Sequence, residues 1–149
     1  MTFGKFLYFF IAAGVATAGF GMMFRTQHKS LLPGAIIGGI GYVLYEWIMQ
    51  EYGSAAVASF AAALFVGLAS EVVARCLKGP AIVFATAGII PLVPGAWLYR
   101  TMLNIVNADY TTAIAVGLET IMIAGAIAMA LGVSTVIARG ALHIRKKKA

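Results

Sequence analysis

A short stretch of an otherwise apolar sequence carries the residues with the clearest chemical potential. Two prolines three positions apart, Pro91 and Pro94, are followed directly by Gly95. Proline has no backbone N–H and its ring collides with the preceding helical turn, so a continuous α-helix is not expected here. We expect two half-helices, and the free amides of the second would suit a carboxylate. The alternative is a proline kink that only shapes helix packing.

Polar side chains follow the break at helical spacing. Arg100, Asn104 and Asn107 stand at positions i, i+4 and i+7, so they share one helix face. An arginine inside a membrane usually faces a protein interior or a cavity and has a partner there. Glu119 is the partner we expect, because it lies about as far after the turn at Asp109 as Arg100 lies before it. Such a pair is either structural, or a site where a substrate carboxylate displaces Glu119, which then takes up a proton. A third possibility is an Arg100 that snorkels out of the bilayer.

The composition indicates whether the chain lies in water or in a membrane. Of its 149 residues, 62% are hydrophobic and 11% are charged, whereas a typical soluble domain has about 25% charged residues. The mean hydropathy is +0.94. There is too little polar surface to cover a water-soluble globule, so we expect an integral membrane protein without a separate soluble domain.

Five apolar stretches appear when the sequence is divided at its charges, prolines and turn residues. Each is close to the length of about 20 residues that a spanning helix needs. The predicted fold class is therefore all-α: a polytopic membrane helix bundle in one transmembrane domain, 1–149, whose fourth segment is broken at a PxxPG motif near the bilayer midplane. The expected spans cover residues 6–24, 31–49, 55–73, 81–106 and 111–138, and residues 139–149 form a basic cytoplasmic tail.

Basic residues predict the orientation. With five crossings and the N-terminus outside, most of the 11 Lys and Arg residues fall on the inner side, as the positive-inside rule requires. A four-span arrangement would place the loop at 25–29 and the basic tail on opposite sides. The basic residues flank membrane segments and do not form one polar face, so no nucleic-acid binding is expected. The predicted location is the cytoplasmic (inner) membrane, with the C-terminus in the cytoplasm. The inner group comprises Arg25, Lys29, Arg75, Lys78, Arg139, Arg145, Lys146, Lys147 and Lys148.

The segment 89–95 (IIPLVPG), with Tyr99 after it, resembles the PxxPG-type segment of the threonine/serine exporter (ThrE) family, specifically its small YjjB-like membrane subunit. The size, the five apolar spans and the basic tail extend the resemblance over nearly the whole chain. The resemblance implies secondary export of small carboxylate metabolites, threonine and serine in some members and succinate in others. It also implies a separate, larger ThrE-type membrane subunit as partner.

We therefore predict a subunit of a secondary transporter that exports small carboxylates with proton coupling. The alternative is a non-transporting scaffold or assembly subunit. An enzyme is not expected, because neither His28 nor His143 has neighbours suited to nucleophilic or metal chemistry, and no cofactor is expected. The single cysteine, Cys76, excludes an internal disulfide. The candidate substrate-binding residues are Pro91, Pro94, Gly95, Arg100 and Asn104, and the proton-coupling candidate is Glu119.

Overall fold

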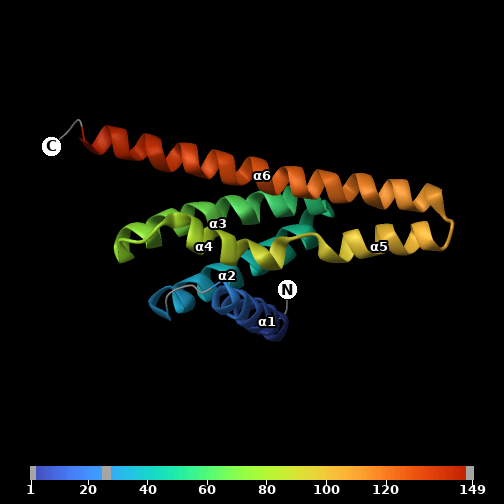
Figure 1. Cartoon of the computed structure of the whole chain (residues 1–149), viewed down its shortest axis with the longest axis horizontal. Coiled ribbons are helices and arrows are strands. Elements are labelled where there is room, and N and C mark those ends of the chain that lie inside the picture. The colour runs from blue at the N-terminus through green and yellow to red at the C-terminus, as the bar shows by residue number, and fades with distance from the viewer. Residues whose placement is uncertain (1–2, 25–27, 147–149) are drawn as a thin grey trace.

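The computed structural model describes residues 3–24 and 28–146, and the regular elements in these ranges are all helices (Figure 1). The all-α class predicted from the sequence is thus confirmed. In chain order the elements are α1 (Phe3–Met23), α2 (His28–Tyr52), α3 (Ala55–Leu77), α4 (Ala81–Ile89), the short 3-10 helix η1 (Ile90–Leu92), α5 (Gly95–Val106) and α6 (Tyr110–Lys146).

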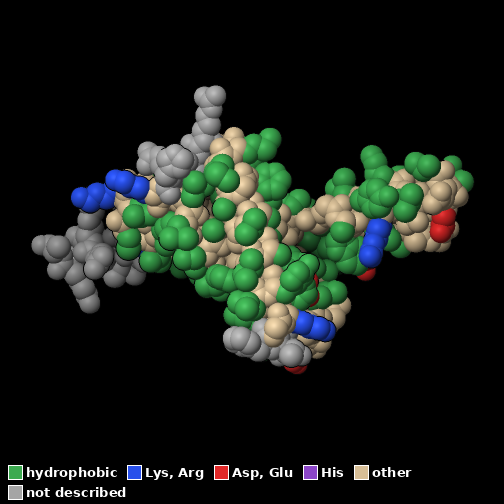
Figure 2. Space-filling model, turned by 90° about the horizontal axis from the view of Figure 1, so that it is seen from below, with side chains coloured by type: hydrophobic (Ala, Val, Ile, Leu, Met, Phe, Trp, Pro, Cys, Tyr) green, Lys and Arg blue, Asp and Glu red, His purple; other side chains and the backbone are tan. Residues whose placement is uncertain are grey.

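The helices match a membrane bundle of up to five crossings. Four of them are long and apolar enough to span a bilayer. The fifth span would consist of α4 and η1 followed by α5. These two parts are long and apolar enough to cross a bilayer only when they are taken together, and they are bent by 47° at the break. Hydrophobic side chains are spread over much of the surface seen in Figure 2, as contact with lipid requires. The four unbroken spans are Gly4–Met23, Lys29–Tyr52, Ala55–Leu77 and Tyr110–Ala138.

The C-terminal helix is longer than the sequence predicted. Residues 139–146 of the expected tail continue α6 as helix, whereas residues 147–149 lie outside the described residues. Arg25 of the expected inner loop lies outside them as well.

Helix α3 is the centre of the bundle. It packs against α2, α4 and α6, while α1 packs mainly on α2. Small residues allow these close approaches: Gly41 of α2 faces Val66, and Gly67 of α3 faces Ser134 of α6. In lipid, close contacts of this kind drive the association of helices. Lipid tails are as apolar as the helix surfaces, so there is no hydrophobic driving force between helices. The buried cluster at the centre consists of Ile37, Ala62, Ala63, Val66, Leu92, Ile123, Ile127 and Ala130.

The hairpin formed by α5 and α6 projects beyond the rest of the bundle (Figure 1). Glu119, nine residues into α6, lines a cavity together with Gly53 and Ser54 of the α2–α3 turn. At 1.5 Å per residue, the α5–α6 turn therefore lies about 14 Å past the α2–α3 turn. Helix α5 packs mainly against α6, none of its residues is buried, and its Trp97 packs against the central buried cluster.

The turn of this hairpin is stabilised by Asp109. Its carboxylate accepts a hydrogen bond of 3.2 Å from the backbone N–H of Thr112, at the start of α6. Hydrogen bonds from the side chain and the backbone of Thr112 lower the pKa of the Asp109 carboxyl below its ordinary value. The charged form therefore favours the helical start, an effect lost as the pH falls through the folded-state pKa.

Substitution of Gly67 by alanine is expected to destabilise the bundle by about 1–3 kcal/mol, because the added β-carbon would overlap the Ser134 side chain. Thermal unfolding in detergent, followed by circular dichroism, measures the effect. Removing the obstacle in the double variant Gly67→Ala with Ser134→Gly should restore most of the stability. Gly132→Ala is the control, since a β-carbon there meets no atom within 4 Å. Equal stability of Gly67→Ala and Gly132→Ala would contradict the α3–α6 packing described here.

Candidate functional site

The paired prolines break the fourth segment as the sequence predicts. In a continuous helix, Pro91 would bond to the carbonyl of Ala87, and Pro94 to that of Ile90. Neither proline can donate. The N–H of Ile90 instead bonds to Ala87, and the N–H of Val93 donates to Ile90 at 3.2 Å. These shorter-range bonds tighten the chain into η1 before α5 starts.

The break lies between the middle of α3 and its start. Gly88, three residues before Pro91, packs against Val66 near the middle of α3. Ser59, in the second turn of α3 and about 6 Å from its start, lines the cavity beside the break. Helix α5 continues past the α2–α3 turn and does not span the same depth as α3. The position of the break at the bilayer midplane stays a prediction.

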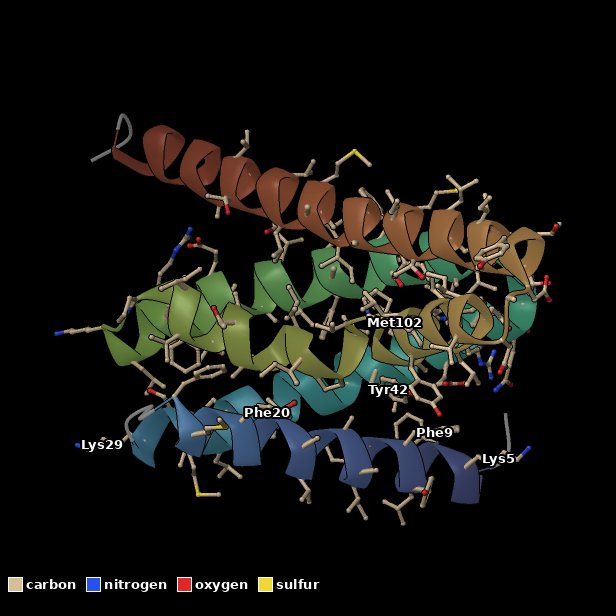
Figure 3. All side chains as sticks on the ribbon, turned by 45° about the vertical axis from the view of Figure 1, so that its right-hand side comes forward. Lys5, Phe9, Phe20, Lys29, Tyr42 and Met102 are labelled. Atoms are coloured by element: carbon tan, nitrogen blue, oxygen red, sulfur yellow. The ribbon has the colours of Figure 1, made fainter. Side chains whose placement is uncertain are left out.

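A cavity of about 150 Å³ opens beside the break. The break supplies Pro91 and Pro94, and α2 supplies Tyr42 and Tyr45. The Tyr42 ring is 5.8 Å from that of Tyr45 and 5.8 Å from that of Phe9 on α1, so the aromatic wall continues across two helices (Figure 3). The cavity is therefore built by residues far apart in the sequence.

One wall of the cavity is the start of α5. No side chain caps this helix. The carbonyl of Pro94 accepts from Leu98 at 3.0 Å, but the first amides of a helix have no acceptor within it. Two of these residues, Ala96 and Trp97, line the cavity. The positive end of the α5 dipole thus borders a space that a carboxylate can occupy.

Another wall carries a buried hydroxyl. Ser59 of α3 is 0% exposed, and its Oγ has no hydrogen-bond partner in the structure. Leaving a buried polar group unpaired costs about 1–3 kcal/mol. A ligand in the adjoining cavity would supply the missing partner.

Arg100 lies next to this site but does not line it. Its side chain is exposed, and the guanidinium carbon is 5.9 Å from the centre of the Trp97 ring. This is a cation–π arrangement that holds the positive charge beside the first turn of α5. Of the other candidates, Gly95 lies at the start of α5, and half-buried Asn104 lies farther along it, outside the cavity.

The expected approach of Arg100 to Glu119 is not seen. Within the described residues these two side chains form no ion pair, and Arg75 with Glu71 form one at 3.8 Å. The reason lies in the helix geometry. Thr101 faces Gly117 where α5 meets α6, and neighbouring residues on a helix point about 100° apart. Equal distance from a turn therefore sets the depth of two side chains but not their direction.

Glu119 has a different environment. It lines a second cavity, of about 200 Å³, together with Ser54, Ala55 and Ala56 at the start of α3. Ser54 caps α3 by accepting a hydrogen bond from the N–H of Val57 at 3.5 Å. The negative charge of Glu119 thus lies near the positive end of the α3 dipole. No group of three or more acidic, histidine or cysteine side chains in the described ranges is arranged to hold a metal ion.

The sequence comparisons decide the family. The family model described as "Threonine/Serine exporter, ThrE" matches residues 9–137, which include the break and the residues lining its cavity. The chain belongs to the threonine/serine exporter family. The resemblance carried by the PxxPG segment is thereby confirmed, and the chain is a multi-pass membrane protein of a transporter family.

Three relatives illustrate the place of this chain in the family. A threonine/serine exporter of Corynebacterium glutamicum is 32% identical over 74% of this chain and 23% of its own length. A probable threonine/serine exporter of Mycobacterium tuberculosis is 32% identical over 66% of this chain and 19% of its own. An uncharacterized protein of Haemophilus influenzae is 29% identical over 71% of this chain and 36% of its own. The chain thus spans about a fifth to a third of these curated relatives. No solved structure matches it.

Sequence reasoning missed three residues of this exporter-family cavity, namely Tyr42, Tyr45 and Ser59. The two tyrosines are three positions apart and so share a helix face, which was a usable signal. Ser59 offered no such signal, because a serine in an alanine-rich span is ordinary helix packing until its neighbours are known. Only the packing of α2 and α3 against the break brings the three together.

Proposed function

We propose that the chain is one subunit of a secondary transporter that exports small carboxylate metabolites across the cytoplasmic membrane. The observation that carries the proposal is the broken span, whose uncapped α5 start borders a cavity inside a membrane bundle. Family membership supports the same reading, since the relatives named above include threonine/serine exporters. Threonine, serine and a dicarboxylate such as succinate all carry the carboxylate that the helix start suits.

The proposed roles follow the positions of the residues. Pro91 and Pro94 open the helix and leave the amides of Ala96 and Trp97 for the substrate carboxylate. Gly95 is the first residue of α5, and its own N–H donates to the carbonyl of Val93 at 2.7 Å. Arg100, stacked on Trp97, adds positive charge at the edge of the cavity. Such charge attracts an anion into a low-dielectric site more strongly than it would in water.

A larger ThrE-type membrane subunit is the proposed partner. The relatives named above extend well beyond the matched region, so a transporter built with this chain needs further segments. The α5–α6 hairpin supports this idea. Lipid can cover its exposed apolar residues, but the polar groups of Arg100 and Asn104 need protein or water. We propose that the partner covers the Asn104 face of α5.

Arg100→Gln should lower carboxylate efflux about tenfold, because the positive charge beside the cavity that attracts the substrate carboxylate is lost. Efflux is measured in proteoliposomes that contain the chain and its larger subunit, after co-purification has shown that the complex assembles. Arg75→Gln is the matched control, since Arg75 pairs with Glu71 away from the cavity. Normal efflux by an assembled Arg100→Gln complex would favour the alternative function, a scaffold subunit.

Glu119→Gln tests the proposed proton coupling. If Glu119 takes up a proton during transport, the variant should lose most of the dependence of efflux on pH, because glutamine does not titrate in this range. The same proteoliposomes, assayed across a series of imposed pH gradients, give the measurement. Glu71→Gln serves as the matched acidic control. A pH profile of Glu119→Gln identical to that of the unaltered complex would remove Glu119 from the coupling mechanism.

The proposed orientation can be tested at Cys76, an exposed residue near the end of α3. With the N-terminus outside, this end of α3 faces the cytoplasm. A membrane-impermeant maleimide should therefore label Cys76 in inside-out vesicles and leave it unlabelled in intact cells. Asn107→Cys in a Cys76→Ser background should behave in the opposite way, because Asn107 is exposed in the α5–α6 turn. Labelling of Cys76 in intact cells would show that the chain has the opposite orientation.

A further inference from the structure

Ser59 differs from five other hydroxyl-bearing residues of the bundle. Inside a helix, a serine or threonine hydroxyl often donates to a carbonyl three or four residues earlier in the same helix. Among the described residues, the buried hydroxyls of Ser59 and Ser70 have no partner, and both residues are 0% exposed. Only Ser59 of these two lines the cavity at the break. The residues that follow the usual pattern are Thr17, Thr101, Thr120, Ser134 and Thr135.

Besides the hydroxyls of Tyr42 and Tyr45, the cavity has polar groups on two further helices. Ala96 and Trp97 contribute the uncapped start of α5, whereas Ser59 belongs to α3. The backbones of α3 and α5 do not approach closely in the described part of the chain. The cavity therefore separates a set of backbone donors from a hydroxyl that can both donate and accept. A ligand that satisfies both must have two polar ends.

The charge of the lining limits what those ends can be. None of the residues lining this cavity is charged, and the nearest cation described above, Arg100, lies behind Trp97 on the α5 side. One carboxylate can be stabilised there by the α5 amides and by this guanidinium. A second carboxylate beside Ser59 would lose its hydration without meeting a cation, which is strongly unfavourable.

We propose that Ser59 is a specificity-determining residue, which hydrogen-bonds to a hydroxyl group of a small monocarboxylate whose carboxylate lies at the start of α5. This inference rests on the proposed transport function and narrows its substrate class. The cavity volume of about 150 Å³ corresponds to about five water molecules at liquid density. The site therefore suits a molecule of few heavy atoms, and the absence of a charged residue from its lining selects against dicarboxylates.

Counterflow in proteoliposomes that contain the full chain and its larger subunit tests the proposal. Uptake of radiolabelled L-serine is measured against unlabelled L-serine, L-alanine and succinate as competitors. L-alanine has the carboxylate but lacks the hydroxyl. We expect L-serine to compete about tenfold better than L-alanine, the value of one hydrogen bond to a buried hydroxyl, and succinate to compete least. Ser59→Ala should reduce the preference for L-serine over L-alanine to about onefold while transport of L-alanine persists.

Ser70→Ala is the matched control, because it removes an unpartnered buried hydroxyl from the same helix but outside the cavity. It should keep the preference for L-serine. The proposal is overturned if Ser59→Ala keeps that preference, if Ser70→Ala loses it equally, or if succinate competes as well as L-serine. Alanine is smaller than serine and favours helix, so both variants should assemble. Counterflow that is absent from the unaltered complex would overturn the proposed function itself, whereas counterflow without a hydroxyl preference overturns the role of Ser59 alone.

Discussion

A bilayer offers no hydrogen-bond partners to an opened backbone, and this constraint governs the arrangement around Pro91 and Pro94. The two prolines remove two donors, and the 3-10 turn of η1 reassigns the carbonyls that would have received them. The start of α5 stays uncapped, so its amides need water, protein or a ligand. The surrounding helices do not close over this point, and a polar cavity lies beside it.

The rest of the bundle holds the break in place. Helix α3 is in contact with α2, α4 and α6, and its small residues let these helices approach closely. Gly88 of α4 packs against Val66 of α3 just before the break, and Leu92 of η1 is buried in the central cluster. At the opposite end of α3, the guanidinium of Arg75 donates to the carbonyl of Ala138 at 2.9 Å, which ties α3 to α6. The break is thus flanked by firm packing on its α4 side and by an open cavity on its α5 side.

The sequence predicted the features that depend on local chemistry and missed those that depend on the direction in which a side chain points. The apolar stretches and the proline pair predicted the helices, the bend and the family, because span length and the missing proline N–H act locally. The pairing of Arg100 with Glu119 was wrong in this structure, since depth along a helix does not determine which way a side chain points. Ser59 could not be found either, because its importance comes from a neighbouring helix. Site residues on one element were therefore predictable, and the cavity between elements was not.

The projecting α5–α6 hairpin also has a mechanical consequence. Helix α5 joins the bundle through η1 at one end, through α6 along its side, and through Trp97, which packs against the central buried cluster. Its 12 residues form a rod about 18 Å long. A rotation of about 10° at the bend would therefore swing the far tip by about 3 Å. The bend lies beside the cavity, so a small change in its angle would displace the far tip of α5 more than the residues that line the cavity.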